Sequence, residues 1–225
     1  MKEVHRQEHK YLISYVDYFK VREAIKTLLI HDQHGPNESY QVNSIYLDDI
    51  YFSGAQDKAF GNELHKKYRI RYYDDITMKK LELKKKTGNS SIKISTPINE
   101  EVFKAIVDND IDILEKHFDD KLIRLYTLDF FRNNLEPKCN IIYKREAYRD
   151  ESDNFRITFD HSLEVSRFDK EISGENIKLM KDTMLMMEIK YEHFIPKEIK
   201  TIIKSIAANQ IAYSKYFLGY DQIIL

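Results

Sequence analysis

The chain has 225 residues, of which 42% are hydrophobic and 32% charged, with a net charge of −1. This composition supplies a hydrophobic core and excludes a disordered chain. The single cysteine, Cys139, excludes an internal disulfide, and no apolar run approaches the roughly 20 residues that a membrane helix needs. We expect one domain over residues 1–225, located in the cytoplasm and not itself inserted in a membrane.

The first half of the chain is predicted to be rich in strands. Alternating polar and apolar residues predict strands, whereas apolar residues recurring every three or four positions predict helices. In chain order the patterns predict a strand at 4–13, a helix at 18–30, a loop at 31–41, and strands at 42–48, 66–74, 79–86 and 90–95. Turns are expected at 74–75 and 87–89.

The second half begins with an acidic segment, from Asn99 to about Asn133, that we expect to be helical with Asn99 as its N-cap. Further patterns predict strands at 139–149, 155–163 and 184–191, and helix from 196 to about 217. These eight strands, mostly joined as hairpins, predict an α+β fold with an antiparallel sheet. Eight antiparallel strands are also sufficient to close into a barrel.

Positive charge is concentrated in one segment. Residues 58–93 contain eleven Lys or Arg against four Asp or Glu, whereas residues 99–120 contain eight acids against two lysines. A near-neutral protein with such a segment either binds an anion there or has a solvated basic surface. Charge alone leaves both interpretations open.

Charged residues also share strand faces, because side chains alternate along a strand. Arg69 and Arg71 share one face, and three strands carry Glu-x-Lys pairs on one face: Glu8/Lys10, Glu82/Lys84 and Glu188/Lys190. One interpretation is a sheet with one wet face. The other is an inside-out barrel whose charged lumen requires a polyanion or water.

The residue types suit triphosphate chemistry more than other chemistries. Carboxylates are ligands for Mg²⁺ or Mn²⁺, and Lys and Arg bind phosphate. The sequence contains no P-loop, GxGxxG, GxSxG or HExxH motif. Tyr72 and Tyr73 beside Arg71 are more simply strand residues than base-stacking platforms, so we expect no nucleic-acid partner.

An ordered set of short motifs resembles the vacuolar transporter chaperone (VTC) domain, a family of triphosphate tunnel enzymes. The matching segments are Glu8-His9-Lys10-Tyr11, Ser44-Ile45-Tyr46-Leu47-Asp48, Tyr68-Arg69-Ile70-Arg71-Tyr72-Tyr73, Leu81-Glu82-Leu83-Lys84, Lys144-Arg145, Phe155-Arg156-Ile157-Thr158, Glu188-Ile189-Lys190 and Ser214-Lys215-Tyr216. The resemblance implies an eight-stranded antiparallel β-tunnel with flanking helices, lined by basic residues.

The resemblance further implies an enzyme, a polyphosphate polymerase that transfers the γ-phosphoryl group of ATP to a polyphosphate chain with Mn²⁺ or Mg²⁺. The residues that it implies for phosphate binding are Lys10, Arg69, Arg71, Lys84, Arg145, Arg156, Lys190 and Lys215. Arg69, Arg71, Arg145, Arg156 and Glu188 are implied to be catalytic, and Glu188 to bind the metal. The expected partners are ATP and polyphosphate; a membrane-protein partner and the oligomeric state are left open.

One departure bears on the activity. The superfamily's hydrolases and cyclases carry Glu-x-Glu-x-Lys on the first strand, and here Arg6 replaces the first Glu. Loss of that carboxylate favours the polymerase branch. Two alternatives remain: an inorganic triphosphatase, and a polyphosphate-binding module without catalytic activity.

Overall fold

The computed structural model describes residues 7–32, 38–56, 64–73, 78–87, 90–152, 154–168, 175–206, 208–212 and 214–224. The chain forms two compact units. Unit 1 comprises Met1–Gln41, Tyr143–Glu164 and Lys178–Tyr213, and unit 2 comprises Val42–Ile142, Val165–Ile177 and Ser214–Leu225. The expectation of a single domain stays a prediction.

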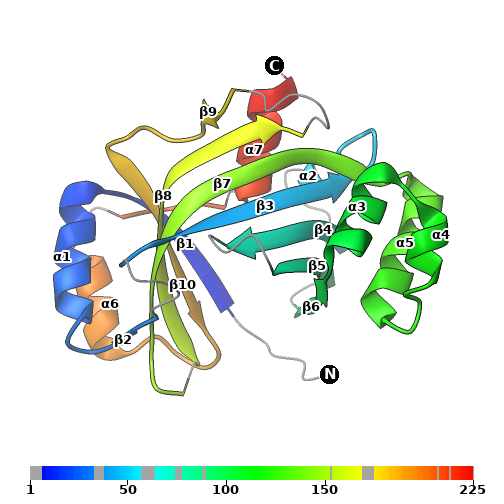
Figure 1. Ribbon diagram of the computed structural model, residues 1–225. Coiled ribbons are helices and arrows are strands. Elements are labelled where there is room, and N and C mark those ends of the chain that lie inside the picture. Colours follow the sequence, from blue (N-terminus) through cyan, green and yellow to red (C-terminus); the bar gives the residue numbers. More distant parts are fainter. Residues whose placement is uncertain are drawn as a thin grey trace. The chain divides into compact units, whose positions relative to one another are not determined.

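The described residues contain eleven strands and seven helices (Figure 1). The strands are β1 (Gln7–Ser14), β2 (Ile30–His31), β3 (Tyr40–Asp48), β4 (Leu64–Tyr73), β5 (Lys79–Thr87), β6 (Ser90–Ile98), β7 (Glu136–Arg149), β8 (Phe155–Arg167), β9 (Ile177–Lys178), β10 (Met184–Tyr191) and β11 (Asn209–Gln210). The helices are α1 (Tyr15–Ile25), α2 (Ser53–Gln56), α3 (Glu100–Asp108), α4 (Ile111–Glu115), α5 (Lys121–Asn133), α6 (Lys197–Lys204) and α7 (Lys215–Ile224).

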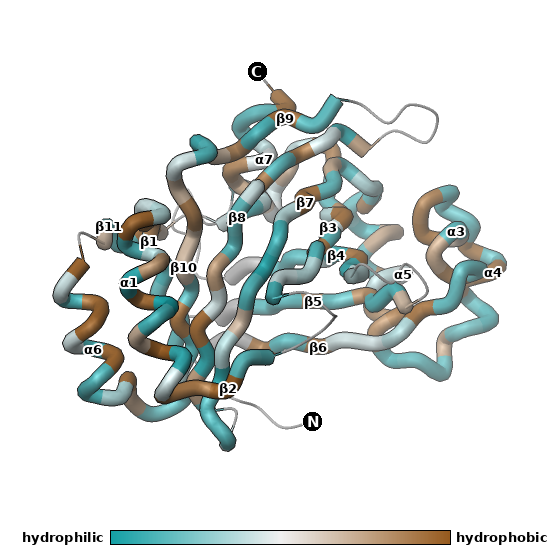
Figure 2. The backbone as a smooth tube through the Cα atoms, turned by 60° about the vertical axis from the view of Figure 1, so that its left-hand side comes forward, coloured by the Kyte–Doolittle hydropathy of each residue, from teal (hydrophilic) through white to brown (hydrophobic). Residues whose placement is uncertain are grey.

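In unit 1 the strand order is β11–β1–β10–β8–β7, and β1–β10 and β10–β8 are antiparallel pairs. One face of these strands is apolar and packs with residues of α1 and α6, which lie side by side in Figure 1. The buried residues of this cluster include Ile157, Phe159, Met187 and Ile189. Figure 2 shows hydrophilic and hydrophobic residues alternating along β8, as expected for a strand with one apolar and one polar face.

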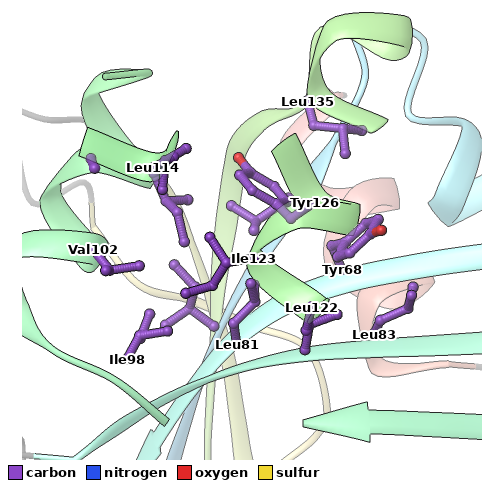
Figure 3. Packing of buried hydrophobic residues seen from close by; sticks show 14 of the residues in the cluster. Tyr68, Leu81, Leu83, Ile98, Val102, Leu114, Leu122, Ile123, Tyr126 and Leu135 are labelled. Carbon is purple, nitrogen blue, oxygen red and sulfur yellow. The ribbon is translucent and has the colours of Figure 1, made fainter. Parts of the chain in front are cut away.

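In unit 2 the order is β7–β3–β4–β5–β6, and β3–β4, β4–β5 and β5–β6 are antiparallel. The apolar face of β3, β4 and β5 packs against α3, α4 and α5. Tyr68, Leu81 and Leu83 of the sheet meet Leu122 and Tyr126 of α5 in this core (Figure 3). In both units, then, helices cover the apolar face of the sheet.

Local sequence explains where the helices of unit 2 begin and end. Asn99 is the N-cap of α3, as predicted, and its side chain accepts from the Val102 amide at 2.9 Å. Asp110 and Asp120 cap α4 and α5 in the same way. Asn109 and Asn134 end α3 and α5 in the left-handed conformation, which Asn tolerates better than most residues.

The predicted α+β class, an antiparallel sheet with flanking helices, is confirmed. All eight predicted strands are present, and the described residues contain three more: β2, β9 and β11. Each of these is two residues long, too short to produce an alternating pattern. Helix α1 also begins earlier than predicted, at Tyr15, because Ser14 caps it by accepting from the Asp17 amide.

Three sequence features lie outside the described residues: Arg6, the turn at 74–75 and residues 88–89 of the second turn. Among the described helices, none combines the length and the apolar character that crossing a membrane requires.

Candidate functional site

Unit 2 carries a strongly basic sheet face. Residues directly opposite each other on neighbouring antiparallel strands point to the same side of the sheet. The register therefore gathers six cations on one face, which we call the basic face: Lys67, Arg69, Arg71, Lys80, Lys84 and Lys93. The described carboxylates on these strand faces are Glu82 of β5 and Asp48 of β3. Six cations against two carboxylates leave a net attraction for anions.

Glu82 lies among the cations of the basic face. Its buried carboxylate forms ion pairs with Arg69 (Nη2 to Oε2, 2.6 Å) and with Lys93 (Nζ to Oε1, 2.6 Å). Burial acts to raise the pKa of Glu82, but Arg69, Arg71 and Lys93 outweigh it and lower the pKa to about 2. Glu82 is thus ionised at neutral pH and orients the Arg69 guanidinium through charge-assisted hydrogen bonds.

The neighbouring strand β3 positions the arginines through neutral groups. Arg71 Nε donates to Ser44 Oγ at 3.3 Å, and Arg69 Nη1 donates to the Tyr46 hydroxyl at 3.4 Å. Arg71 is buried, with 9% of its surface exposed. Ser44 and Tyr46 thus hold the two guanidinium groups through neutral hydroxyls, while Glu82 supplies the negative charge that Arg69 contacts.

Helix α7 is anchored beside the same strand. The Tyr216 hydroxyl donates to Asp48 Oδ2 at 2.7 Å, and the Tyr216 ring stacks on Tyr46 with centroids 4.3 Å apart. Asp48 also accepts from the backbone amides of Gly54 and Ala55. Burial and the charge of Asp48 raise the pKa of Tyr216, so its hydroxyl remains a donor. This anchor fixes the first turn of α7, which begins at the buried Lys215.

Unit 1 has a polar sheet face of different character. The register places Glu8 and Lys10 of β1 opposite Lys190 and Glu188 of β10, and these lie opposite Arg156 and Thr158 of β8. Asp160 of β8 shares this face by alternation, and Arg145 of β7 joins it by binding Asp160. We call these eight residues the mixed face: Glu8, Lys10, Arg145, Arg156, Thr158, Asp160, Glu188 and Lys190. Its four cations are balanced by three carboxylates of the face and by Asp32, which follows β2 and binds Arg156.

The most buried part of the mixed face is an Arg–Asp pair. Arg145 binds Asp160 in a bidentate manner, from Nε to Oδ1 at 2.6 Å and from Nη2 to Oδ2 at 2.7 Å. Asp160 is completely buried and Arg145 is 8% exposed. Although burial disfavours the guanidinium, Asp160 raises the pKa of Arg145. Arg145 Nη2 also lies 3.6 Å from Glu188 Oε2, so one guanidinium contacts both acids.

Glu188 and its neighbours complete the face. Lys190 Nζ lies 3.2 Å from Glu188 Oε2, and Lys10 Nζ lies 3.1 Å from Glu8 Oε1. Arg156 donates from Nη2 to Asp32. Glu188 is thus a buried carboxylate with cations around it.

The donor set fits a metal that takes most of its ligands from substrate. Among the described residues, no three His, Cys, Asp or Glu side chains are grouped as a protein-only metal site. Asp160 is held at both oxygens by Arg145, whereas Lys190 and Arg145 approach buried Glu188 less closely, at 3.2 Å and 3.6 Å. Mg²⁺ is commonly bound by one or two carboxylates together with phosphate oxygens and water. Glu188 is compatible with that mode.

The nine site residues predicted from the sequence divide between the two units. Lys10, Arg145, Arg156, Glu188 and Lys190 lie on the mixed face, Arg69, Arg71 and Lys84 lie on the basic face, and Lys215 begins α7. Their roles in binding and catalysis stay predictions.

Sequence reasoning missed several members of these faces. Lys93 and Asp160 were both detectable, because each alternates in phase with charged or hydroxyl residues of its own strand. Asp32 gave no such signal, since it follows a two-residue strand. Glu82 shares a face with Lys84, as predicted, and its ion-pair partners Arg69 and Lys93 come from the neighbouring strands.

Comparison with known proteins assigns the family. A model of the VTC domain matches residues 5–224, nearly the whole chain. The chain belongs to the VTC domain family. A search of curated protein sequences found no match to this VTC domain.

Solved structures resemble this VTC domain in fold at low sequence identity. HpAC1 from Hippeastrum, a candidate adenylyl cyclase described as having a dominant triphosphatase activity, is 13% identical, with a TM-score of 0.59 and coverage of 100% of this chain and 98% of that one. The PH1819 protein from Pyrococcus horikoshii OT3 is 16% identical, with a TM-score of 0.52 and coverage of 96% of both chains. A candidate adenylate cyclase from Bacillus halodurans is 13% identical, with a TM-score of 0.52 and coverage of 95% and 96%. At these identities the likeness shows a shared fold.

Proposed function

We propose that this VTC domain is a metal-dependent phosphotransferase of the polyphosphate polymerase type, which transfers the γ-phosphoryl group of ATP to a polyphosphate chain in the cytoplasm. The observation that carries the proposal is the basic face, where six cations meet two carboxylates. Such an excess suits a polyanion. Glu188 on the mixed face supplies the carboxylate that metal-assisted phosphoryl transfer needs.

In the proposed reaction, a terminal oxygen of polyphosphate forms a bond to the γ-phosphorus of ATP. The bond from that phosphorus to the β–γ bridging oxygen breaks, and ADP leaves. Arg69, Arg71, Arg145 and Arg156 stabilise the charge that spreads over the transferred oxygens. Mn²⁺ or Mg²⁺ at Glu188 neutralises phosphate charge when bound. The nucleophile is already an anion and needs alignment, so no general base is assigned.

Two other functions have specific support. Inorganic triphosphatase activity is favoured by the likeness in fold to HpAC1, which is described as having that activity. A polyphosphate-binding module without catalysis would need the basic face alone. Incubation with ATP and Mn²⁺ or Mg²⁺, analysed by gel for chain length, separates the three. We expect long phosphate chains and ADP; orthophosphate released from tripolyphosphate would identify a hydrolase, and tight binding without turnover a binding module.

The basic face predicts a contrast between two adjacent lysines. Lys84 lies opposite Lys67 and Lys93 on the basic face, whereas Lys85 points to the other side of β5, and both are exposed. Lys84→Ala is therefore expected to weaken polyphosphate binding several-fold and to reduce the slope of log K against log salt by about 1. Lys85→Ala should leave both unchanged. Titrations at several NaCl concentrations measure this, and equal effects of the two variants would remove the basic face as the binding surface.

A further inference from the structure

The mixed face contains two buried polar atoms whose hydrogen-bonding capacity is unused. Among the described residues, three buried side-chain N or O atoms have no hydrogen-bond partner, and two of them are Arg156 Nε and Thr158 Oγ1. Arg156 and Thr158 are two positions apart on β8 and point to the same side of the sheet. Thr158 is only 1% exposed. Folded proteins rarely leave such groups unsatisfied, so the pair calls for an explanation.

The surroundings of Thr158 are those of a phosphate site. Glu188 lies directly opposite it on β10, and Lys190 lies directly opposite Arg156. Asp160, two positions further along β8, accepts a hydrogen bond from Arg145 at each of its carboxylate oxygens. Thr158 therefore lies on a sheet face that also carries Arg145, Arg156 and Lys190, and its buried hydroxyl has no hydrogen-bond partner among the described residues. A phosphate oxygen accepts both from a hydroxyl and from a guanidinium N–H, which is what these two groups offer.

We propose that Thr158 is a substrate-binding residue, whose hydroxyl, together with Arg156 Nε, donates hydrogen bonds to a non-bridging oxygen of a triphosphate or polyphosphate chain. The inference rests on the proposed function and adds to it a neutral hydroxyl donor. In the ligand-free protein the hydroxyl is buried without a partner, which costs stability. Substrate binding removes that cost, so the group favours the bound state.

The proposal predicts opposite effects of one substitution on stability and on binding. Thr158→Val keeps the shape of the side chain and removes the hydroxyl. Without ligand, its thermal unfolding midpoint is expected to be equal to or higher than that of the natural protein, because an unsatisfied buried group is lost. Its affinity for sodium tripolyphosphate is expected to be about 10- to 100-fold weaker, the range for a lost hydrogen bond to a charged group.

Two further variants serve as controls. Thr158→Ser retains the hydroxyl and should bind tripolyphosphate close to normally. Thr127 is also completely buried, but its hydroxyl donates to the Ile123 carbonyl at 3.0 Å within α5. Thr127→Val should therefore lower the unfolding midpoint and leave tripolyphosphate affinity unchanged, the reverse of the pattern at Thr158.

The experiment is calorimetric titration of each purified variant with sodium tripolyphosphate, with and without Mg²⁺, and thermal unfolding without ligand. The pattern above supports the proposal. Unchanged affinity in Thr158→Val, or an equal loss in Thr158→Ser, overturns it while leaving the proposed function intact. If the natural protein itself does not bind tripolyphosphate, the proposed function fails and this inference fails with it.

Discussion

Replacing Arg145 by methionine is expected to lower the free energy of unfolding by about 3–5 kcal/mol, the scale for removing one partner of a buried ion pair. Asp160 is completely buried and accepts two hydrogen bonds from Arg145, so the variant leaves a carboxylate in the protein without its counter-ion. Urea unfolding followed by circular dichroism measures the change. Lys144→Met is the matched control, because Lys144 is the preceding residue of β7 and is exposed; its effect should stay within about 0.5 kcal/mol.

The double variant Arg145→Met/Asp160→Leu separates stability from function. Replacing both members of a buried ion pair by apolar residues is often neutral or stabilising, so most of the lost stability should return. Phosphoryl transfer should not return, because the guanidinium beside Glu188 is absent. A well-folded double variant with normal turnover would show that the pair is only structural. An unfolding free energy of Arg145→Met equal to that of the natural protein would contradict the role of Arg145 in neutralising Asp160.

The alternation of residues along the strands was sufficient to predict which charged side chains share a face. It placed Arg69 with Arg71, and Glu188 with Lys190, and the registers agree. The opposite side of β10 is apolar, as the same alternation requires: Leu185, Met187 and Ile189 are buried. The reason is physical: a period of two is rigid, so one buried residue fixes the orientation of every other residue in its strand.

Partners across strands were harder to predict, because register depends on turns and bulges that parity does not encode. Glu82 contacts Arg69 on β4 and Lys93 on β6, and neither pairing follows from its own strand. The Arg145–Asp160 pair, which joins β7 to β8, could not be predicted for the same reason. Contacts from short segments, such as Asp32 to Arg156, left no pattern at all. Convergence of the basic and mixed faces on one phosphate chain stays a prediction.

Glu188→Gln is expected to reduce the turnover number for phosphoryl transfer by about 10²–10³, the range for losing one group that stabilises the transition state. Glutamine preserves the size of the side chain but removes the charge that a divalent cation requires. Lys190 and Arg145 also lose a negative neighbour, at 3.2 and 3.6 Å, which strengthens the attraction of the mixed face for phosphate. The KM for ATP should therefore not increase, and the defect should lie in kcat.

The split between kcat and KM distinguishes a metal-binding carboxylate from a structural one. If Glu188 were only structural, its loss would loosen the arginines, raise KM and lower kcat. If Glu188 is a metal ligand, its loss should leave the affinity for tripolyphosphate, measured without metal, unchanged or greater. Half-maximal activity of Glu188→Gln should also require a higher Mn²⁺ concentration. Glu198→Gln, at an exposed position in the first turn of α6, controls for the loss of one negative charge. Near-normal turnover by Glu188→Gln at the same Mn²⁺ concentration would remove Glu188 from the metal site.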